Sequence, residues 1–211
     1  MKIAVVSESP ADEAAINILI DAIIGTDSDL YPVRTRPHGW TRVFELLPNI
    51  VNALHYGTDV EALVVVVDSD ESPVHQDFHD ALQVENTKCR LCRLRTTVDR
   101  ALSRVRAVPN RASLKTGLGL AVQAIEAWYR CGLDPHVNEA TWVRRLGGER
   151  TTYDKRSLKA DVYGSYQPSL LVETEAAVLA ATRLADNIEL LEQLFPIGFG
   201  CLLLDVRGWS E

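Results

Sequence analysis

Residues 62–70 constrain the fold of this chain more than any other segment. The run Ala-Leu-Val-Val-Val-Val-Asp-Ser-Asp places a leucine and four valines in succession, which is typical of a parallel strand buried on both faces. It ends in Asp68 and Asp70, whose side chains project to the same side of an extended backbone, roughly 6–7 Å apart. Because open α/β sheets bind their ligands at the carboxyl ends of parallel strands, the segment predicts a functional site at that edge.

Two carboxylates held close together repel each other unless a cation or a shared proton lies between them. A pair of oxygen ligands suits a hard divalent ion, so we expect Asp68 and Asp70 to bind Mg²⁺ or Mn²⁺. The alternative for the pair on its own is a solvated turn or a helix cap.

Hydrophobic periodicity predicts alternating strands and helices in the first part of the chain. The expected elements are a strand at 2–7, a helix from 9 to 25, a short strand at 31–36, a helix at 41–55 and a strand at 62–67. Ser9 is the expected N-cap of the first helix and Gly25 its end, while Pro48 should kink or split the second. This order predicts an α/β fold with a mostly parallel, Rossmann-like sheet flanked by helices.

The rest of the chain is expected to be mainly helical. The predicted elements are helices at 74–82, 87–105, 117–131, 141–146 and 174–194, an edge strand at 107–109, and a last strand or buried segment at 199–206. The polar stretch 132–166 is otherwise rich in turns. We expect a single domain over residues 1–211, in which 1–110 form the core with the acidic site and 111–211 add helices and the last strand.

A third acid, Glu8, follows the first predicted strand. If this strand and the strand at 62–67 are neighbours in the sheet, their ends lie about 4.8 Å apart. Glu8, Asp68 and Asp70 would then converge on one metal-sized gap. For Glu8 alone, the alternative is an exposed loop residue or an acid at a helix start.

These motifs carry a family resemblance. Val-Val-Ser-Glu8-Ser-Pro-Ala-Asp-Glu, followed by Val-Val-Val-Val-Asp68-Ser-Asp70, resembles the signature of Toprim domains, which occur in topoisomerases, primases, small ribosomal-RNA maturases and overcoming-lysogenization-defect nucleases. Ala-Ile-Glu126-Ala-Trp128 is similar to the Ile-Glu-x-Trp motif of small standalone Toprim-like proteins of bacterial defence islands (the DUF4276-type group). The segment from Leu158 to Gly164, which contains Lys159, corresponds to a lysine-plus-glycine segment in that group.

The resemblance covers the first seventy residues and the region around Glu126. Two features depart from the family pattern: Ser9-Pro10 stands where many relatives have a glycine, and the Arg/Cys segment 88–95 has no counterpart.

The resemblance implies a Toprim-like, Mg²⁺-dependent nuclease that cleaves DNA or RNA, acting as an effector of bacterial antiphage defence beside an ABC-type ATPase partner. Asp68 and Asp70 would bind the metal, while Glu8 would complete its ligand shell or act as general base. Glu126 would hold a second metal or orient its helix, and Lys159 would stabilise phosphate charge.

Glu126 and Lys159 each have a structural interpretation as an alternative to these roles. Glu126 and Arg130 are spaced as an exposed i,i+4 ion pair. Trp128 is expected in the core, and the sequence alone favours a solvated position for Lys159.

Basic charge is concentrated between Lys88 and Arg111, where eight basic residues face one acid for a local charge of +7. Because the whole chain carries −7, the remainder carries −14. Arginine is the better bidentate phosphate ligand. The expected nucleic-acid contacts are Arg90, Arg93, Arg95, Arg100 and Arg104. The alternative is a solvated helix face, and the net charge of −7 argues against recruitment to nucleic acid without a partner.

Two short spacings of cysteine and histidine resemble parts of metal sites, but we do not expect the histidine pair to be ligands. Cys89-Arg-Leu-Cys92 has the spacing of half a zinc site, but no second pair follows it, so we expect reduced structural cysteines, with a redox pair as the alternative. Whether Cys89 and Cys92 bind metal is left open. His75 and His79 are four residues apart, yet Gln76 replaces the glutamate of a His-Glu-x-x-His motif. No phosphate-binding loop for ATP hydrolysis is present.

Two further functions remain as alternatives to the nuclease. One is a non-catalytic regulatory or assembly subunit that docks the arginine-rich segment onto an acidic partner such as the ATPase. The other is a phospho-acceptor receiver domain, for which the chain lacks the later Thr/Ser and Lys strand ends.

The sequence shows no apolar run of the 18 or so residues that a membrane span requires. Its N-terminus resembles a first strand and not a secretory signal. We therefore expect a cytoplasmic protein that does not bind membranes; a homo-oligomer is compatible with the sequence.

Overall fold

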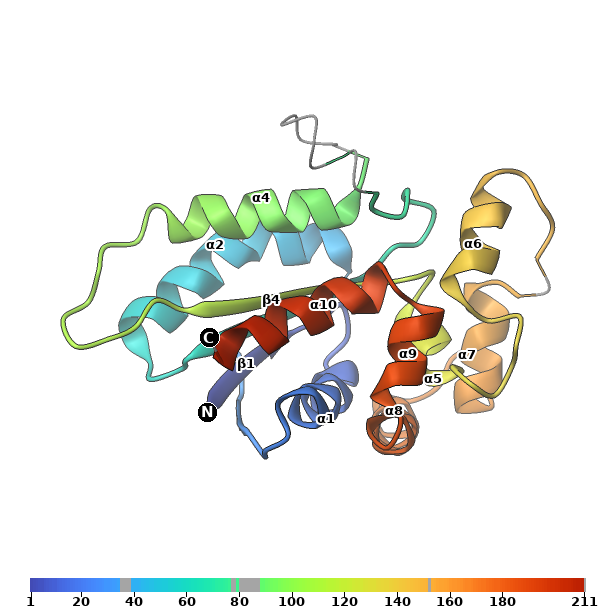
Figure 1. Ribbon diagram of the computed structural model, residues 1–211. Helices are drawn as coiled ribbons and strands as arrows, with labels where there is room; N and C mark the ends of the chain where they lie inside the picture. Colours follow the sequence, from blue (N-terminus) through green and yellow to red (C-terminus); the bar gives the residue numbers. More distant parts are fainter. Residues whose placement is uncertain (35–38, 77–78, 80–87, 152, 211) are drawn as a thin grey trace.

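The structure is a computed structural model that describes residues 1–34, 39–76, 79, 88–151 and 153–210 (Figure 1). Strands β1, β2 and β3 and the helices between them form the N-terminal part of the fold. In chain order, the described elements are β1 (Lys2–Val6), α1 (Asp12–Ile24), β2 (Asp29–Tyr31), α2 (Trp40–Gly57), β3 (Ala62–Asp68), α4 (Arg90–Leu102), β4 (Lys115–Ala121), α5 (Ile125–Tyr129), α6 (Glu139–Leu146), α7 (Lys155–Tyr163), α8 (Leu170–Ala185), α9 (Ile188–Leu194), α10 (Gly198–Arg207) and η1 (Gly208–Ser210).

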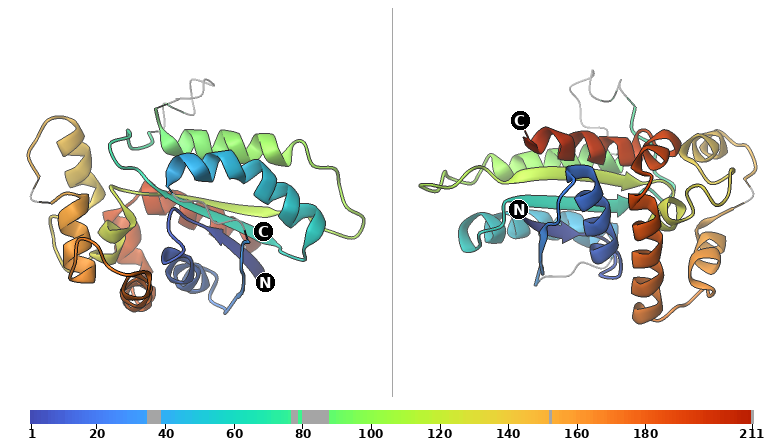
Figure 2. Two further views of the ribbon diagram at one scale, coloured as in Figure 1. Left: turned by 180° about the vertical axis from the view of Figure 1, so that it is seen from behind. Right: turned by 60° about the horizontal axis from the view of Figure 1, so that its bottom comes forward.

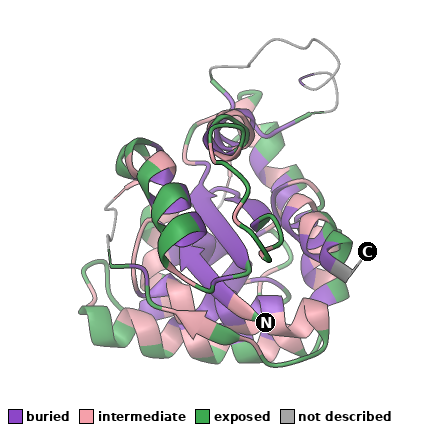
Figure 3. Cartoon of the chain, turned by 90° about the vertical axis from the view of Figure 1, so that its left-hand side faces the viewer, coloured by how far each residue is buried: buried purple, intermediate pink, exposed green. Residues whose placement is uncertain are grey.

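The four described strands form one parallel sheet in the order β2-β1-β3-β4. The predicted α/β fold with a parallel sheet is therefore confirmed. The first strand and the strand at 62–67 are neighbours, which was the condition for bringing Glu8 near Asp68. Val6 pairs with Val65, and Asp68 at the end of β3 pairs with Ala121 at the end of β4. Every residue of β3 is buried (Figure 3), as expected for a strand that is apolar up to its final Asp68.

Helices cover both faces of the sheet. Helices α2 and α4 lie together on one face, and α1 and α10 lie on the other (Figures 1 and 2). This division follows because crossovers between parallel strands are right-handed. The connection from β1 to β2, which contains α1, runs one way across the sheet. The connections from β2 to β3 and from β3 to β4, which contain α2 and α4, run the other way, so these helices lie on the opposite face. The reversal makes the gap between the carboxyl ends of β1 and β3 the topological switch point, the place where such sheets bind ligands.

Beyond the carboxyl ends of the strands, the chain builds a helical cap. Helices α5, α6, α7 and α9 gather at this end of the molecule, and α8 packs along α1 (Figure 1). In the described part of the chain, no helix combines the length and apolar character needed to cross a bilayer.

The predicted helix at 117–131 is wrong, because its first residues form β4 and only 125–129 are helical. Gly117 and Gly119 alternate with Leu118 and Leu120, a two-residue period that belongs to a strand. The glycine face lies against α10, where a Cβ on Gly117 would meet the Leu202 side chain at 3.2 Å. The glycines thus allow a helix to pack closely on the edge strand.

The segment 199–206 is part of α10 and not a strand. It covers the glycine face of β4, and Asp205 on α10 accepts a hydrogen bond from the exposed-edge N–H of Leu118 at 2.9 Å. The expected edge strand at 107–109 is irregular, because β4 occupies the edge of the sheet.

Other differences concern helix ends. The segment 174–194 forms two helices, α8 and α9, since the Asn187 side chain caps α9 by accepting from the N–H of Leu190. Ser9 does not cap α1, which begins at Asp12 after Ala11. Helix α2 continues through Pro48 without a break.

For three further elements, the observed bounds can be compared with the predicted ones. The short strand at 31–36 is β2 at 29–31, with 35–38 outside the described residues. Residues 74–76 are not helical, and the remainder of the helix expected at 74–82 lies largely outside the described residues. The expected helix at 141–146 is confirmed as α6, whereas α7 was not predicted.

Replacement of Gly198 by alanine should destabilise the fold. A Cβ at this first residue of α10 would clash with the backbone carbonyl of Leu120 in β4, and overpacking of this kind costs about 1–3 kcal/mol. We expect Gly198→Ala to lower the free energy of unfolding by that amount in urea titrations. Gly57→Ala is the matched control, because nothing lies within 4 Å of its Cβ position; equal effects of the two substitutions would contradict the proposed close packing.

Candidate active site and metal centre

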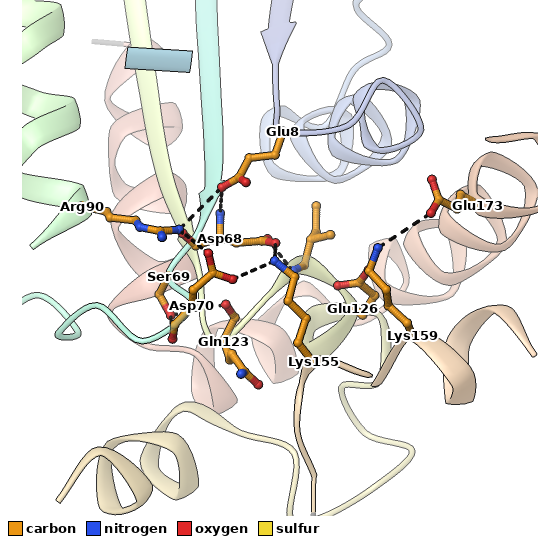
Figure 4. A network of polar contacts seen from close by, with 11 residues as sticks. Glu8, Asp68, Ser69, Asp70, Arg90, Gln123, Glu126, Lys155, Lys159 and Glu173 are labelled. Carbon is orange, nitrogen blue, oxygen red and sulfur yellow. Dashed lines mark hydrogen bonds and ion pairs between the residues drawn. The ribbon is translucent and has the colours of Figure 1, made fainter. Parts of the chain in front are cut away.

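A pocket of about 190 Å³ opens at the switch point between β1 and β3. We call it the acidic pocket, because five carboxylates and two lysines line it: Glu8, Asp12, Asp68, Glu126, Glu173, Lys155 and Lys159. Figure 4 shows acids from the ends of β1 and β3 and from helices α5 and α8, together with both lysines from α7. The remaining acid, Asp12, comes from α1.

Asp68 is the last residue of β3 and is 9% exposed. Its Oδ1 accepts a hydrogen bond from the N–H of Ile125 at 3.0 Å, and its Oδ2 accepts from Nζ of Lys155 at 2.7 Å. Burial raises the pKa of Asp68, the charge of Lys155 opposes this, and Asp70 adds to the rise. Asp68 is thus a buried carboxylate held by the cap of the sheet.

Asp70 lies beside the pocket and not in its lining. Its backbone has a φ of +45°, a left-handed conformation that aspartate adopts more readily than most residues. Its carboxylate is held from both sides, by Nζ of Lys155 at 2.7 Å and by Nη1 of Arg90 at 2.8 Å. Burial raises the pKa of Asp70, but these two cations outweigh it and hold the pKa below its usual value.

Glu8 reaches the same edge from the end of β1. Its Oε1 accepts from the backbone N–H of Asp68 at 2.9 Å and lies 3.8 Å from Arg90. Burial, reinforced by the charge of Asp68, raises the pKa of Glu8 to about 7. The structure therefore brings Glu8 and Asp68 together as the sequence predicted.

Glu126 lies inside the pocket and not on an exposed helix face. It is 3% exposed, so the interpretation of an exposed pair with Arg130 is wrong. Its Oε1 lies 3.6 Å from Nζ of Lys159, while its Oε2 is buried without a hydrogen-bond partner among the described residues. Burial and the charge of Asp68 raise the pKa of Glu126 to about 7. Trp128 is fully buried, which confirms its place in the core.

Lys159 is 32% exposed in its side chain and also lies 3.8 Å from Glu173. It is therefore not a fully solvated lysine but a cation at the wall of the acidic pocket. Its contacts with both Glu126 and Glu173 tie α7 to α5 and α8.

Sequence reasoning missed Lys155, which makes the central contacts. Two signals could have found it: Asp154 and Ser157 form a capping box that starts α7 at Lys155, and Lys155 and Lys159 are one helical turn apart. Asp12 was also missed as a pocket residue; it is buried, accepts a hydrogen bond from Tyr129 at 2.8 Å, and has a pKa that burial raises well above its usual value.

The predicted arginine contacts divide into two groups. Arg90 is buried and stacks over the ring of Trp40 at 4.4 Å while it pairs with Asp70. Arg93 stacks over the same ring at 4.6 Å, and Arg95 donates to Nε2 of His75 at 3.2 Å. Arg100 and Arg104 are exposed near the end of α4. Of the five predicted contacts, only Arg100 and Arg104 face solvent as a phosphate-binding surface requires.

A second group of titratable side chains lies outside the acidic pocket. His75, His79, Cys89 and Cys92 are all buried, and one ligand atom from each lies within 4.8 Å of the others. We call this group the His/Cys cluster; it is able to hold a metal ion. Sequence reasoning considered its histidine and cysteine pairs separately, although the histidine pair precedes the cysteines by only ten residues.

The acids are arranged differently. Among the described residues, only the His/Cys cluster forms such a compact group of ligand atoms; Glu8, Asp68 and Asp70 do not. The ammonium group of Lys155 lies between Asp68 and Asp70 at 2.7 Å from each. Direct binding of one ion by all three predicted ligands would therefore require Lys155 to move.

Comparison of the chain with protein-family models, with curated proteins and with solved structures finds no match.

Substitution of Lys155 by methionine should expose the repulsion between Asp68 and Asp70. Removing one partner of a buried ion pair leaves an uncompensated charge and costs 3–5 kcal/mol when burial is complete. Because the Lys155 side chain is 36% exposed, we expect a smaller loss of about 1–3 kcal/mol at pH 7.5 in urea titrations. Arg156→Met is the control, since Arg156 stacks on Tyr166 outside the pocket. An equal loss in both variants would contradict the role of Lys155.

Replacement of Glu126 by glutamine should stabilise the protein at alkaline pH. The folded-state pKa of about 7 exceeds the usual 4.5, so the stability linked to this group is fully present below pH 4.5 and is lost as the pH rises through 7. Glutamine keeps the shape and does not ionise. We expect Glu126→Gln to exceed the wild type by about 1–3 kcal/mol at pH 8 and to match it near pH 5.

Chemical denaturation at the two pH values measures this difference. Glu175→Gln, at an exposed position of α8, is the control and should show no such change. A difference between Glu126→Gln and the wild type that does not vary with pH would refute the assignment.

Proposed function

We propose that the acidic pocket is the active site of a Mg²⁺-dependent nuclease, with Mn²⁺ as an alternative metal, that hydrolyses phosphodiester bonds in DNA or RNA. The observation that carries the proposal is an excess of buried negative charge. Burial and neighbouring charge raise the pKa of both Glu8 and Glu126 to about 7, and one oxygen of Glu126 has no partner among the described residues. Such a site gains stability from an added cation.

The oxygen ligands of the pocket fit a hard divalent ion. Asp68 and Glu126 line the pocket and would hold it, and Asp70 would join them if Lys155 moved away. Glu8 would either complete this ligand shell or act as general base. When bound, Mg²⁺ supplies Lewis-acid stabilisation of negative charge on a phosphoryl oxygen.

The side chains of the pocket would contribute the remaining chemistry. In the role of general base, Glu8 would accept a proton from the attacking water, and its pKa of about 7 suits a general base that works near neutral pH. Lys155 and Lys159 both project from α7 into the pocket and would bind the phosphate oxygens. Arg100 and Arg104 are exposed and would contact more distant phosphates.

The cellular setting in this proposal rests on the resemblance to standalone Toprim-like proteins. We propose an effector of bacterial antiphage defence, located in the cytoplasm and controlled by an ABC-type ATPase. The net charge of −7 supports a need for such a partner, because an acidic protein is recruited poorly to nucleic acid by itself.

A second candidate is a non-catalytic Toprim-like subunit that regulates or assembles with the ATPase. The position of Lys155 favours it, since the ammonium group lies 2.7 Å from both Asp68 and Asp70 and neutralises charge where a metal would bind. In this case Lys155 is a permanent internal counter-ion.

Nuclease assays distinguish the two. We expect the purified chain, with its ATPase partner where one is encoded nearby, to cleave supercoiled DNA, linear DNA or tRNA in Mg²⁺ or Mn²⁺ and not in EDTA. Asp68→Asn should lower the rate by at least about 10²-fold, because it removes a charged metal ligand without a change of shape.

Asp186→Asn is the matched control, because Asp186 is exposed at the end of α8. No metal-dependent cleavage of any of the three substrates, or full activity in Asp68→Asn, would refute the nuclease and favour the regulatory subunit.

A further inference from the structure

We propose that the His/Cys cluster binds one Zn²⁺ ion in a closed, structural site that is separate from the acidic pocket. It would fasten the segment after β3 to the start of α4. Cys89 is the N-cap residue of α4, Cys92 lies in its first turn, and His75 lies in the segment that follows β3.

Three of the sulfur–nitrogen distances in the cluster match the spacing of ligands in a tetrahedral zinc site. Zn–S bonds of about 2.3 Å and Zn–N bonds of about 2.0–2.1 Å place sulfur and nitrogen about 3.6 Å apart. Nδ1 of His75 lies 3.3 Å from Sγ of Cys92 and 3.7 Å from Sγ of Cys89, and Nδ1 of His79 lies 3.7 Å from Sγ of Cys92. These distances match the edges of such a tetrahedron.

The chemistry of the ligands selects the metal. Two sulfurs and two imidazole nitrogens in tetrahedral array suit Zn²⁺ and do not suit Mg²⁺, which requires oxygen ligands. Two thiolates cancel the charge of Zn²⁺, so the bound site is neutral, as a buried site requires. Four protein ligands leave no open position for substrate, which is typical of a structural site.

Binding of the metal changes the surroundings of His75. Arg95 donates to Nε2 of His75 at 3.2 Å and to Sγ of Cys201 at 3.4 Å. Because a guanidinium is only a donor, Nε2 accepts here and the histidine proton is on Nδ1. Zinc bound at Nδ1 would require the histidine proton to lie on Nε2. Nε2 would then be a donor and could no longer accept a hydrogen bond from Arg95. Arg95 is therefore not required for metal binding.

The proposed zinc also affects the position of Arg90. This residue lies between the two cysteines in sequence, and its guanidinium pairs with Asp70 and donates to the backbone carbonyl of Asp68. Fixing Cys89 and Cys92 to one ion holds the start of α4, and with it Arg90, against the end of β3. The zinc site thus supports the edge of the acidic pocket without contributing to its chemistry.

The principal rival is a redox-active disulfide. A Cys-x-x-Cys pair at a helix N-terminus is typical of thiol oxidoreductases, although Cys89 and Cys92 are not joined by a disulfide in the structure. The two histidine nitrogens within 3.7 Å of Sγ of Cys92 favour a metal site. A disulfide forms without imidazole ligands, whereas a metal ion bound by two thiolates requires further ligands.

Metal analysis of the full-length protein tests the proposal. We expect one zinc per chain by inductively coupled plasma mass spectrometry. Exchange with Co²⁺ should give the visible absorption of tetrahedral cobalt and a thiolate charge-transfer band. In the wild type, a mercurial that blocks thiols should release one equivalent of zinc to a chromogenic chelator, a readout that does not depend on the folding of any variant.

Substitutions then locate the ion. Cys92→Ser and His79→Gln should reduce the zinc content from one to near zero, whereas Cys131→Ala, which removes a buried thiol outside the cluster, should retain it. Asp68→Asn should also retain zinc, which separates this site from the proposed nuclease site. Folded wild type without zinc, a Cys89–Cys92 disulfide found by mass spectrometry, or full zinc content in both ligand variants would overturn the proposal.

Discussion

The parallel pairing of β1 with β3 is the constraint on which the rest of the site depends. Its register places Val6 opposite Val65, so that two residues further on Glu8 accepts a hydrogen bond from the backbone N–H of Asp68. Burial of both strands then removes water from the carboxylates that follow them. A sheet built for apolar packing thereby creates a strongly charged edge, and the surrounding helices must supply the compensating cations.

The compensation is uneven along that edge. Asp70 has two close cations, and its pKa lies below the usual value, whereas Glu8 and Glu126 are deeper in the pocket and have raised pKa values. Lysine is well suited to the middle position, because a flexible ammonium group is able to exchange one carboxylate partner for another or for a phosphate. Lys155 therefore distinguishes the two functional candidates: a metal site that includes Asp70 needs Lys155 to move, whereas a regulatory subunit needs it to remain.

The sequence predicted the features that depend on local pattern. The valine run predicted β3, and the acids after β1 and β3 predicted a shared edge, because parallel strands align their ends. It did not predict β4, whose glycines have no propensity for a strand and are explained only by the approach of α10. It missed Lys155 for a related reason: the residue is 85 positions from Asp70, and only the folded cap brings the two together. The capping box at Asp154 marks the start of the helix that carries Lys155, but no local pattern indicates that this helix faces Asp70.

The His/Cys cluster shows the same limit of prediction from local pattern. Each pair of ligands is unremarkable by itself, and their combination depends on the path of the chain from β3 to α4. Arg90 connects the cluster to the acidic pocket, since it is flanked by Cys89 and Cys92 and reaches Asp70. A soft metal bound by sulfur and nitrogen and a hard metal bound by oxygen would not compete for ligands. The chain is therefore able to bind a structural zinc ion in the His/Cys cluster while the carboxylates at the edge of the sheet stay available for a separate ion.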